Sequence, residues 1–88
     1  MGNFMGGSAW AMAQQIAEGY ILVSERTYKR LERVELDKLG FEMEKLLREV
    51  RGEQVPLDDV QAIQQKNRKA SRLMGAVSQL RQYQQRLR

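Results

Sequence analysis

The chain's single proline, Pro56, separates two long segments that each have the residue pattern of a helix. Proline lacks a backbone N–H and its ring clashes with the preceding turn, so a helix does not run undisturbed through this position. Gly52 precedes the proline as a typical helix stop, and Asp58 follows it as a candidate N-cap. The sequence therefore predicts a turn over residues 52–57 between helices over residues 25–51 and 58–87.

Both predicted helices carry an apolar stripe with the spacing of a coiled-coil seam. The apolar residues recur at alternating intervals of three and four residues, which keeps them on one helix face. Two long helices joined by a short turn lie antiparallel. We therefore predict an all-α helical hairpin whose seams form a protein interface. The predicted interface residues are Leu36, Leu39, Met43, Leu46 and Val50 in the first helix, and Leu73, Gly75, Val77 and Leu80 in the second.

The segment before the hairpin has a third helical pattern. Small and apolar residues share one face from Ala9 to Tyr20, which predicts a short helix over residues 9–22 after a flexible leader over residues 1–8. A single domain of 88 residues has a marginal core, and without cysteines no disulfide supports it. We expect support from self-association, with a dimer resembling a four-helix bundle favoured. Packing of the short helix against the hairpin is the alternative.

The composition argues against catalysis. The chain contains no histidine and no cysteine, so the commonest general base and the thiolate and imidazole metal ligands are missing. The carboxylate pairs Glu32/Glu35 and Asp58/Asp59 stand among basic residues or at a helix start, with no nucleophile or orienting base beside them. We predict that the protein is not an enzyme and binds neither a metal nor a cofactor.

The charges are unevenly distributed along the chain. Residues 1–59 hold eight basic and eleven acidic side chains, a net charge of −3, whereas residues 60–88 hold seven basic side chains and no acidic one. The basic helix is a possible nucleic-acid-binding site, because cations on one helix face bind phosphates. The alternative is that these cations pair with acidic residues of the first long helix. The candidate phosphate-binding residues are Lys66, Arg68, Lys69 and Arg72.

Two further features of the last helix have both a functional and a structural interpretation. Gly75, with Ser71 and Ser78 nearby, marks either a close approach of another backbone or a tolerated glycine on a solvated face. Asn67 lies in line with the apolar stripe, where a buried asparagine can fix helix register. The alternative is that Asn67 lies at the rim.

The segment Ile21-Leu22-Val23-Ser24-Glu25-Arg26-Thr27-Tyr28-Lys29-Arg30-Leu31 resembles the opening of ribbon-helix-helix repressors and some antitoxins. The resemblance implies a short strand before Ser24 that pairs across a dimer and enters the DNA major groove, with Gly40 as a turn between two helices. The segment departs from the family in its apolar residues at positions 20–23, where DNA-facing strands carry polar or basic side chains.

The remaining predictions from the sequence concern membrane binding and cellular location. The segment Trp10–Val23 carries no lysine or arginine, unlike helices that bind membrane surfaces, so a membrane partner is not expected. With no secretory signal and no cysteine, we expect a cytoplasmic protein. The function predicted from the sequence is therefore protein–protein interaction as a scaffold, adaptor or assembly module. The alternative is nucleic-acid binding through the basic helix.

Overall fold

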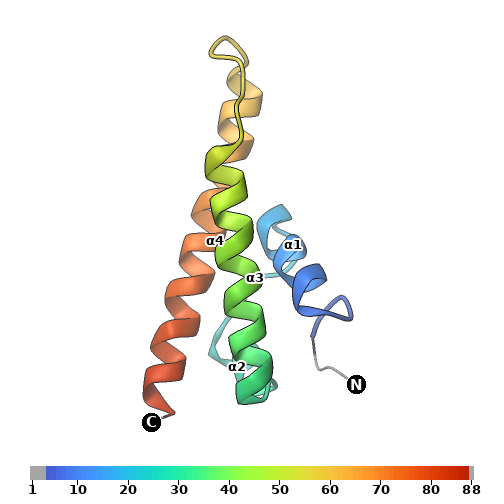
Figure 1. Cartoon of the computed structure of the whole chain (residues 1–88), viewed down its shortest axis with the longest axis vertical. Coiled ribbons are helices and arrows are strands. Elements are labelled where there is room, and N and C mark those ends of the chain that lie inside the picture. Colours follow the sequence, from blue (N-terminus) through green and yellow to red (C-terminus); the bar gives the residue numbers. More distant parts are fainter. Residues whose placement is uncertain (1–3, 88) are drawn as a thin grey trace.

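A computed structural model describes residues 4–87, which form four helices and no strand. The two longest helices run side by side in opposite directions, α1 lies against one side of them, and α2 lies near the end where α4 finishes (Figure 1). The all-helical fold predicted from the sequence is thus confirmed. The helices are α1 (Ala9–Glu18), α2 (Glu25–Lys29), α3 (Arg33–Gly52) and α4 (Val60–Arg86).

The connection between α3 and α4 lies where Pro56 predicted a turn. The Asp59 side chain accepts a hydrogen bond from the backbone N–H of Ala62 at 3.0 Å and so caps α4. Helix α4 runs from Val60 to Arg86, so the predicted helix over residues 58–87 is two residues too long at its start and one at its end. The cap is Asp59 and not the predicted Asp58.

The predicted helix over residues 25–51 is wrong, because the structure divides it into α2 and α3. Glu32 has an extended backbone with ψ 164°, and its N–H donates to Oε1 of Glu35 at 2.9 Å. This contact satisfies a donor at the start of α3 and favours a new helix over continuation of α2. The break lets Leu31, which is 7% exposed, enter the core.

The predicted helix over residues 9–22 also ends early, at Glu18. Gly19 adopts a left-handed conformation with φ +83°, which terminates α1 as a C-cap glycine. The N–H of Tyr20 then donates to the carbonyl of Gln15 at 2.9 Å. Residues 20–23 therefore form a connection and not a fourth helical turn.

Part of the predicted flexible leader packs against the protein. Residues 1–3 of this leader lie outside the described residues. Phe4 and Met5 are half-buried against the core, and the N–H of Gly7 donates to the carbonyl of Phe4 at 3.1 Å. Ser8 then caps α1 by accepting from the N–H of Ala11 at 3.1 Å. Residues 4–8 thus belong to the folded unit, because their apolar side chains find burial there.

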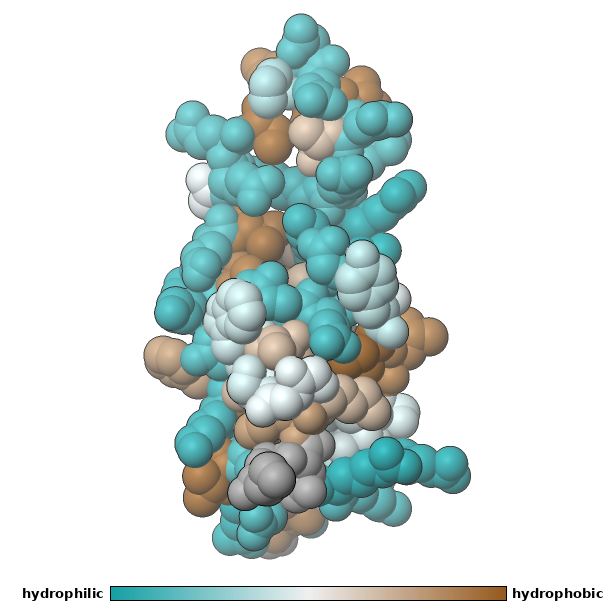
Figure 2. Space-filling model, turned by 90° about the vertical axis from the view of Figure 1, so that its right-hand side faces the viewer, coloured by the Kyte–Doolittle hydropathy of each residue, from teal (hydrophilic) through white to brown (hydrophobic). Residues whose placement is uncertain are grey.

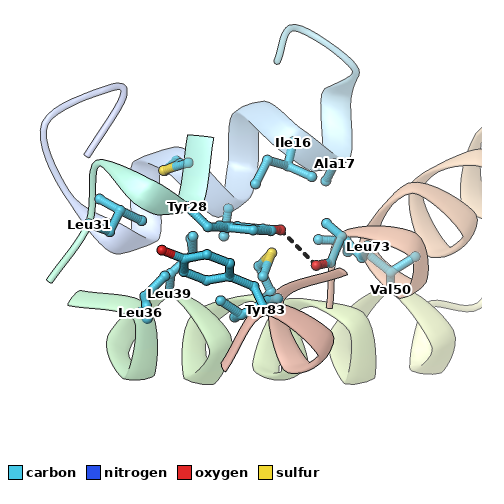
Figure 3. Packing of buried hydrophobic residues seen from close by; sticks show 14 residues of the cluster. Ile16, Ala17, Tyr28, Leu31, Leu36, Leu39, Val50, Leu73 and Tyr83 are labelled. Carbon is cyan, nitrogen blue, oxygen red and sulfur yellow. Dashed lines mark hydrogen bonds between the residues drawn. The ribbon is translucent and has the colours of Figure 1, made fainter. Parts of the chain in front are cut away.

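The core lies where α1 and α2 cover the lower part of the α3–α4 pair in Figure 1, and Figure 3 shows its side chains. Tyr28 is its largest fully buried side chain, and its hydroxyl donates to the carbonyl of Ala76 at 2.7 Å. The Tyr28 and Tyr83 rings lie 6.2 Å apart between centroids. Burial raises the pKa of the Tyr28 phenol above its ordinary value. Helix α1 packs against both α3 and α4 and so covers their apolar faces within the same chain.

Candidate interaction surface

The seam residues predicted as a protein interface lie mainly inside this core. Leu36, Leu39, Met43, Leu73 and Leu80 are each at most 1% exposed. Their contacts are made within one chain, so a partner does not reach them while the chain stays folded.

The remaining seam positions are at its margin. Val50 is 5% exposed, and Leu46 and Val77 are partly buried against the core. Gly75 is exposed, and a Cβ added there would have no heavy atom within 4 Å. Gly75 therefore marks no close approach of another backbone within the chain. Asn67 is exposed as well, so it is not a buried residue of the stripe.

The basic cluster of α4 is divided between two roles. Nζ of Lys69 lies 3.1 Å from Oε1 of Glu18, and the Arg72 guanidinium donates to the carbonyl of Ala17 at 2.9 Å. Both cations thus hold the C-terminal end of α1 on α4, where the helix dipole favours positive charge. Lys66 is half-buried and Arg68 exposed, with no ion pair to either one among residues 4–87.

Other charges of α4 also face acidic residues of the chain. Arg81 contacts Glu44 at 2.8 Å and Arg86 contacts Glu25 at 3.2 Å. The carboxylates considered for catalysis have a structural role, because Glu35 and Asp59 accept hydrogen bonds at the starts of α3 and α4. Within residues 4–87, no group of three or more metal-ligating side chains comes together.

Beyond the Lys69–Glu18 contact, the start of α4 and the connection before it extend past α1, and the last turn of α3 leads into them (Figure 1). We call residues 47–68 the distal arm. Leu57 is 94% exposed and Val60 is 61% exposed. Leu47, Val55 and Ile63 are only half-buried. The arm therefore presents apolar side chains to solvent at its end and along its length.

The charges of the distal arm are separated by sign. Its tip, residues 53–59, carries Glu53, Asp58 and Asp59, a net charge of −3. Its base, residues 47–52 and 60–68, carries four cations and one anion, a net charge of +3. All three ion pairs found among residues 4–87 lie outside the arm. The charged base residues are Arg48, Glu49, Arg51, Lys66 and Arg68.

Charged and apolar side chains of this end lie close together on the surface. In the space-filling view, the upper part of the molecule shows apolar side chains between hydrophilic ones (Figure 2). The interface residues predicted from the helical spacing do not include Leu57 or Val60. The available signal was the apolar residue directly after Pro56, in a turn where polar residues are usual.

Two grooves lie elsewhere on the surface. One, of about 340 Å³, runs between the start of α3 and the end of α4, and its polar side chains bond to one another: Gln84 donates to Asp37 at 2.9 Å and accepts from Arg81 at 2.7 Å. The other, of about 190 Å³, lies between residues 19–23 and α4 beside Gly75. Neither groove contains a cluster of reactive groups.

The structure does not have the arrangement implied by the ribbon-helix-helix resemblance. Helix α3 is continuous through Gly40, which is buried against Leu80 and Arg81, and residues 4–87 contain no strand. None of the helices is long and apolar enough to cross a membrane, within the part of the chain that the structure describes. Comparison with protein-family models, curated proteins and solved structures gave no match.

Proposed function

We propose that this protein is a non-catalytic protein-binding module, a scaffold, adaptor or assembly factor, that makes its contact through the distal arm. The observation that carries the proposal is the exposure of Leu57 and Val60 at the end of a hairpin that α1 leaves uncovered. Exposed apolar side chains that cluster on one region and are rimmed by polar ones are typical of interaction sites. When a partner protein binds such a site, the interface buries the apolar side chains at its centre and the polar ones at its rim.

The contact is proposed on the arm and not on the predicted seam, because the seam already forms the chain's own core. The cytoplasm is the proposed location, since a chain without cysteine suits a reducing compartment.

Binding of nucleic acid is the less favoured alternative. Lys69 and Arg72 are engaged with α1, which leaves Arg68 and the half-buried Lys66 of the four predicted phosphate-binding residues. The distal arm as a whole carries four cations and four anions. The three acidic side chains of the tip repel a phosphate backbone and so oppose binding through the four cations beside them.

A photo-crosslinking amino acid placed at Val60 in the full-length protein tests the proposal in the cells that produce it. The matched control is the same amino acid at Val34, which is 63% exposed against 61% for Val60. Val34 lies at the start of α3, far from the distal arm. We expect discrete protein adducts from position 60 and none from position 34.

Two results would contradict the proposal. Adducts of the same abundance from both positions would show non-specific contact. Adducts to nucleic acid from position 60 would favour the alternative function.

A further inference from the structure

We propose that the distal arm binds the distal arm of a second copy of this chain, in antiparallel orientation, with each tip against the other copy's base. This inference rests on the proposed protein-binding function and names its partner.

The charge of the arm is complementary to itself only when one copy is reversed. The tip carries −3 and the base +3. Parallel pairing would place tip on tip and base on base, whereas antiparallel pairing places opposite charges together at both ends. Such a pairing is isologous, since one two-fold axis relates the two contacts.

The spacing along α4 suits this pairing. Asp58 lies in the turn just before α4, and the helix rises about 12 Å from its first residue, Val60, to Arg68. A two-fold axis crossing the arm midway, near Ile63, brings Asp58 of one copy level with Arg68 of the other. Helix α1 does not cover the first turns of α4, so this part of the arm is open to a second copy (Figure 1).

Antiparallel pairing also suits the distribution of apolar side chains along the arm. The most exposed of them, Leu57 and Val60, belong to the tip and the start of α4, whereas Leu47 lies at the base. Antiparallel pairing therefore brings the exposed Leu57 of each tip toward the half-buried apolar side chains of the other copy's base. Two arms of this size bury less area than a standard stable interface, so we expect a dissociation constant of about 10⁻⁵ M or weaker.

Analytical ultracentrifugation of the full-length protein over a wide concentration range tests the inference. We expect a monomer–dimer equilibrium that weakens as salt is raised, because exposed charges are screened. Reversal of the base by Arg48→Glu with Arg68→Glu makes its net charge −1, and reversal of the tip by Glu53→Lys with Asp58→Lys makes its net charge +1. Each variant alone then repels its own copy.

A mixture of the two variants is the decisive measurement. In an antiparallel heterodimer both contacts again join opposite charges, so we expect association close to that of the wild type in the mixture and at least about tenfold weaker association in each variant alone. The control is Arg26→Glu with Lys38→Glu, which changes the net charge equally at exposed positions outside the arm and should leave self-association within about twofold.

The outcomes separate this inference from the proposed function. A wild-type protein that stays monomeric at about 1 mM overturns the inference. So does a mixture that associates no better than the separate variants, or reversed variants that dimerise like the wild type. If position 60 crosslinks to a different protein while the chain stays monomeric, the proposed function holds and the inference alone fails.

Discussion

The lower part of the α3–α4 hairpin is covered by α1 and α2, whereas residues 47–68 extend beyond them. The covered part contains Tyr28 with its buried hydrogen bond and all three ion pairs described above. The distal arm has exposed apolar side chains and oppositely charged ends without an ion pair. The same pair of helices therefore supplies stability at one end, where a third helix completes the core, and binding surface at the other.

This difference follows from the length of α1. With ten residues, α1 extends about 15 Å, whereas α4 has 27 residues and extends about 40 Å. The ends of α1 are fixed by Ser8 and by Gly19, so the core reaches only the base of the arm, where Val50 is 5% exposed. We therefore expect substitutions in the covered part to change the stability of the chain and substitutions in the arm to change its association.

The largest effect is expected from Leu39→Asp. Leu39 is 0% exposed, so the change removes buried apolar area and places an unpaired carboxylate in the core. We expect a loss of more than about 3 kcal/mol in the free energy of unfolding, with helicity lost at 25 °C, measured by circular dichroism in urea. The control Val60→Asp should leave the monomer folded, and equal losses in both variants would contradict the comparison.

Tyr28→Phe should lower the free energy of unfolding by about 1–2 kcal/mol, because a buried hydrogen bond to the carbonyl of Ala76 is lost. The loss should depend on pH. Burial holds the phenol neutral in the folded chain above its ordinary pKa of 10.0, while the unfolded chain ionises. The Tyr28 contribution is therefore complete below pH 10 and declines as the pH rises further.

Urea titrations at pH 7 and near pH 11 check this expectation. Stability of the wild type should fall above pH 10 by up to about 1.4 kcal/mol per pH unit from Tyr28. The stability difference between wild type and Tyr28→Phe should shrink accordingly. A difference that is constant across this pH range would show that the Tyr28 phenol is not shifted.

The glycines of the two long helices provide a smaller comparison. Gly75→Ala should stabilise the chain by about 0.5–1 kcal/mol, since glycine has low helix propensity and the new methyl group would lie in open space. Gly40→Ala should bring no such gain, because its Cβ would lie 3.1 Å from Cδ2 of Leu80 and from the Arg81 guanidinium. Thermal unfolding measures both, and an equal rise in Tm would contradict the close packing at Gly40.

The smallest effect concerns the basic cluster. Arg72→Gln should lower the free energy of unfolding by about 0.5–1 kcal/mol, because the charged donor at the end of α1 is lost. Arg68→Gln, on the arm side of Lys69, should change it by less than about 0.3 kcal/mol. Equal effects in urea titrations would remove the distinction between structural and exposed cations in this cluster.

The hairpin was predictable because its signals are local. Pro56 marks the turn and the next aspartates mark the helix start to within one residue, since Asp59 and not the predicted Asp58 is the cap. The three-four spacing identifies the residues of α3 and α4 that face the core. The break between α2 and α3 was missed because Leu31 continues the apolar pattern of a single helix. The irregular five-residue step from Leu31 to Leu36 was the available signal, and the structure explains it by the extended backbone of Glu32.

The interaction surface was not predictable in the same way. A stripe of apolar residues looks alike whether it contacts the same chain or another one, so the spacing of Leu36 to Val50 could not assign these residues to core or interface. The decisive contacts join distant segments, such as Tyr28 with Ala76 and Arg72 with Ala17. No helical periodicity reports contacts between residues this far apart in the sequence.

The order of α1 before α4 in the sequence has a consequence for biosynthesis. Its buried residues Met12 and Ile16 pack in a core that also needs Leu80 and Tyr83. At translation rates of about 5–20 residues per second, roughly 3–14 s separate the synthesis of these two groups. During this interval α1 has no complete surface to dock on, so the nascent chain exposes its apolar face until the last turns of α4 leave the ribosome.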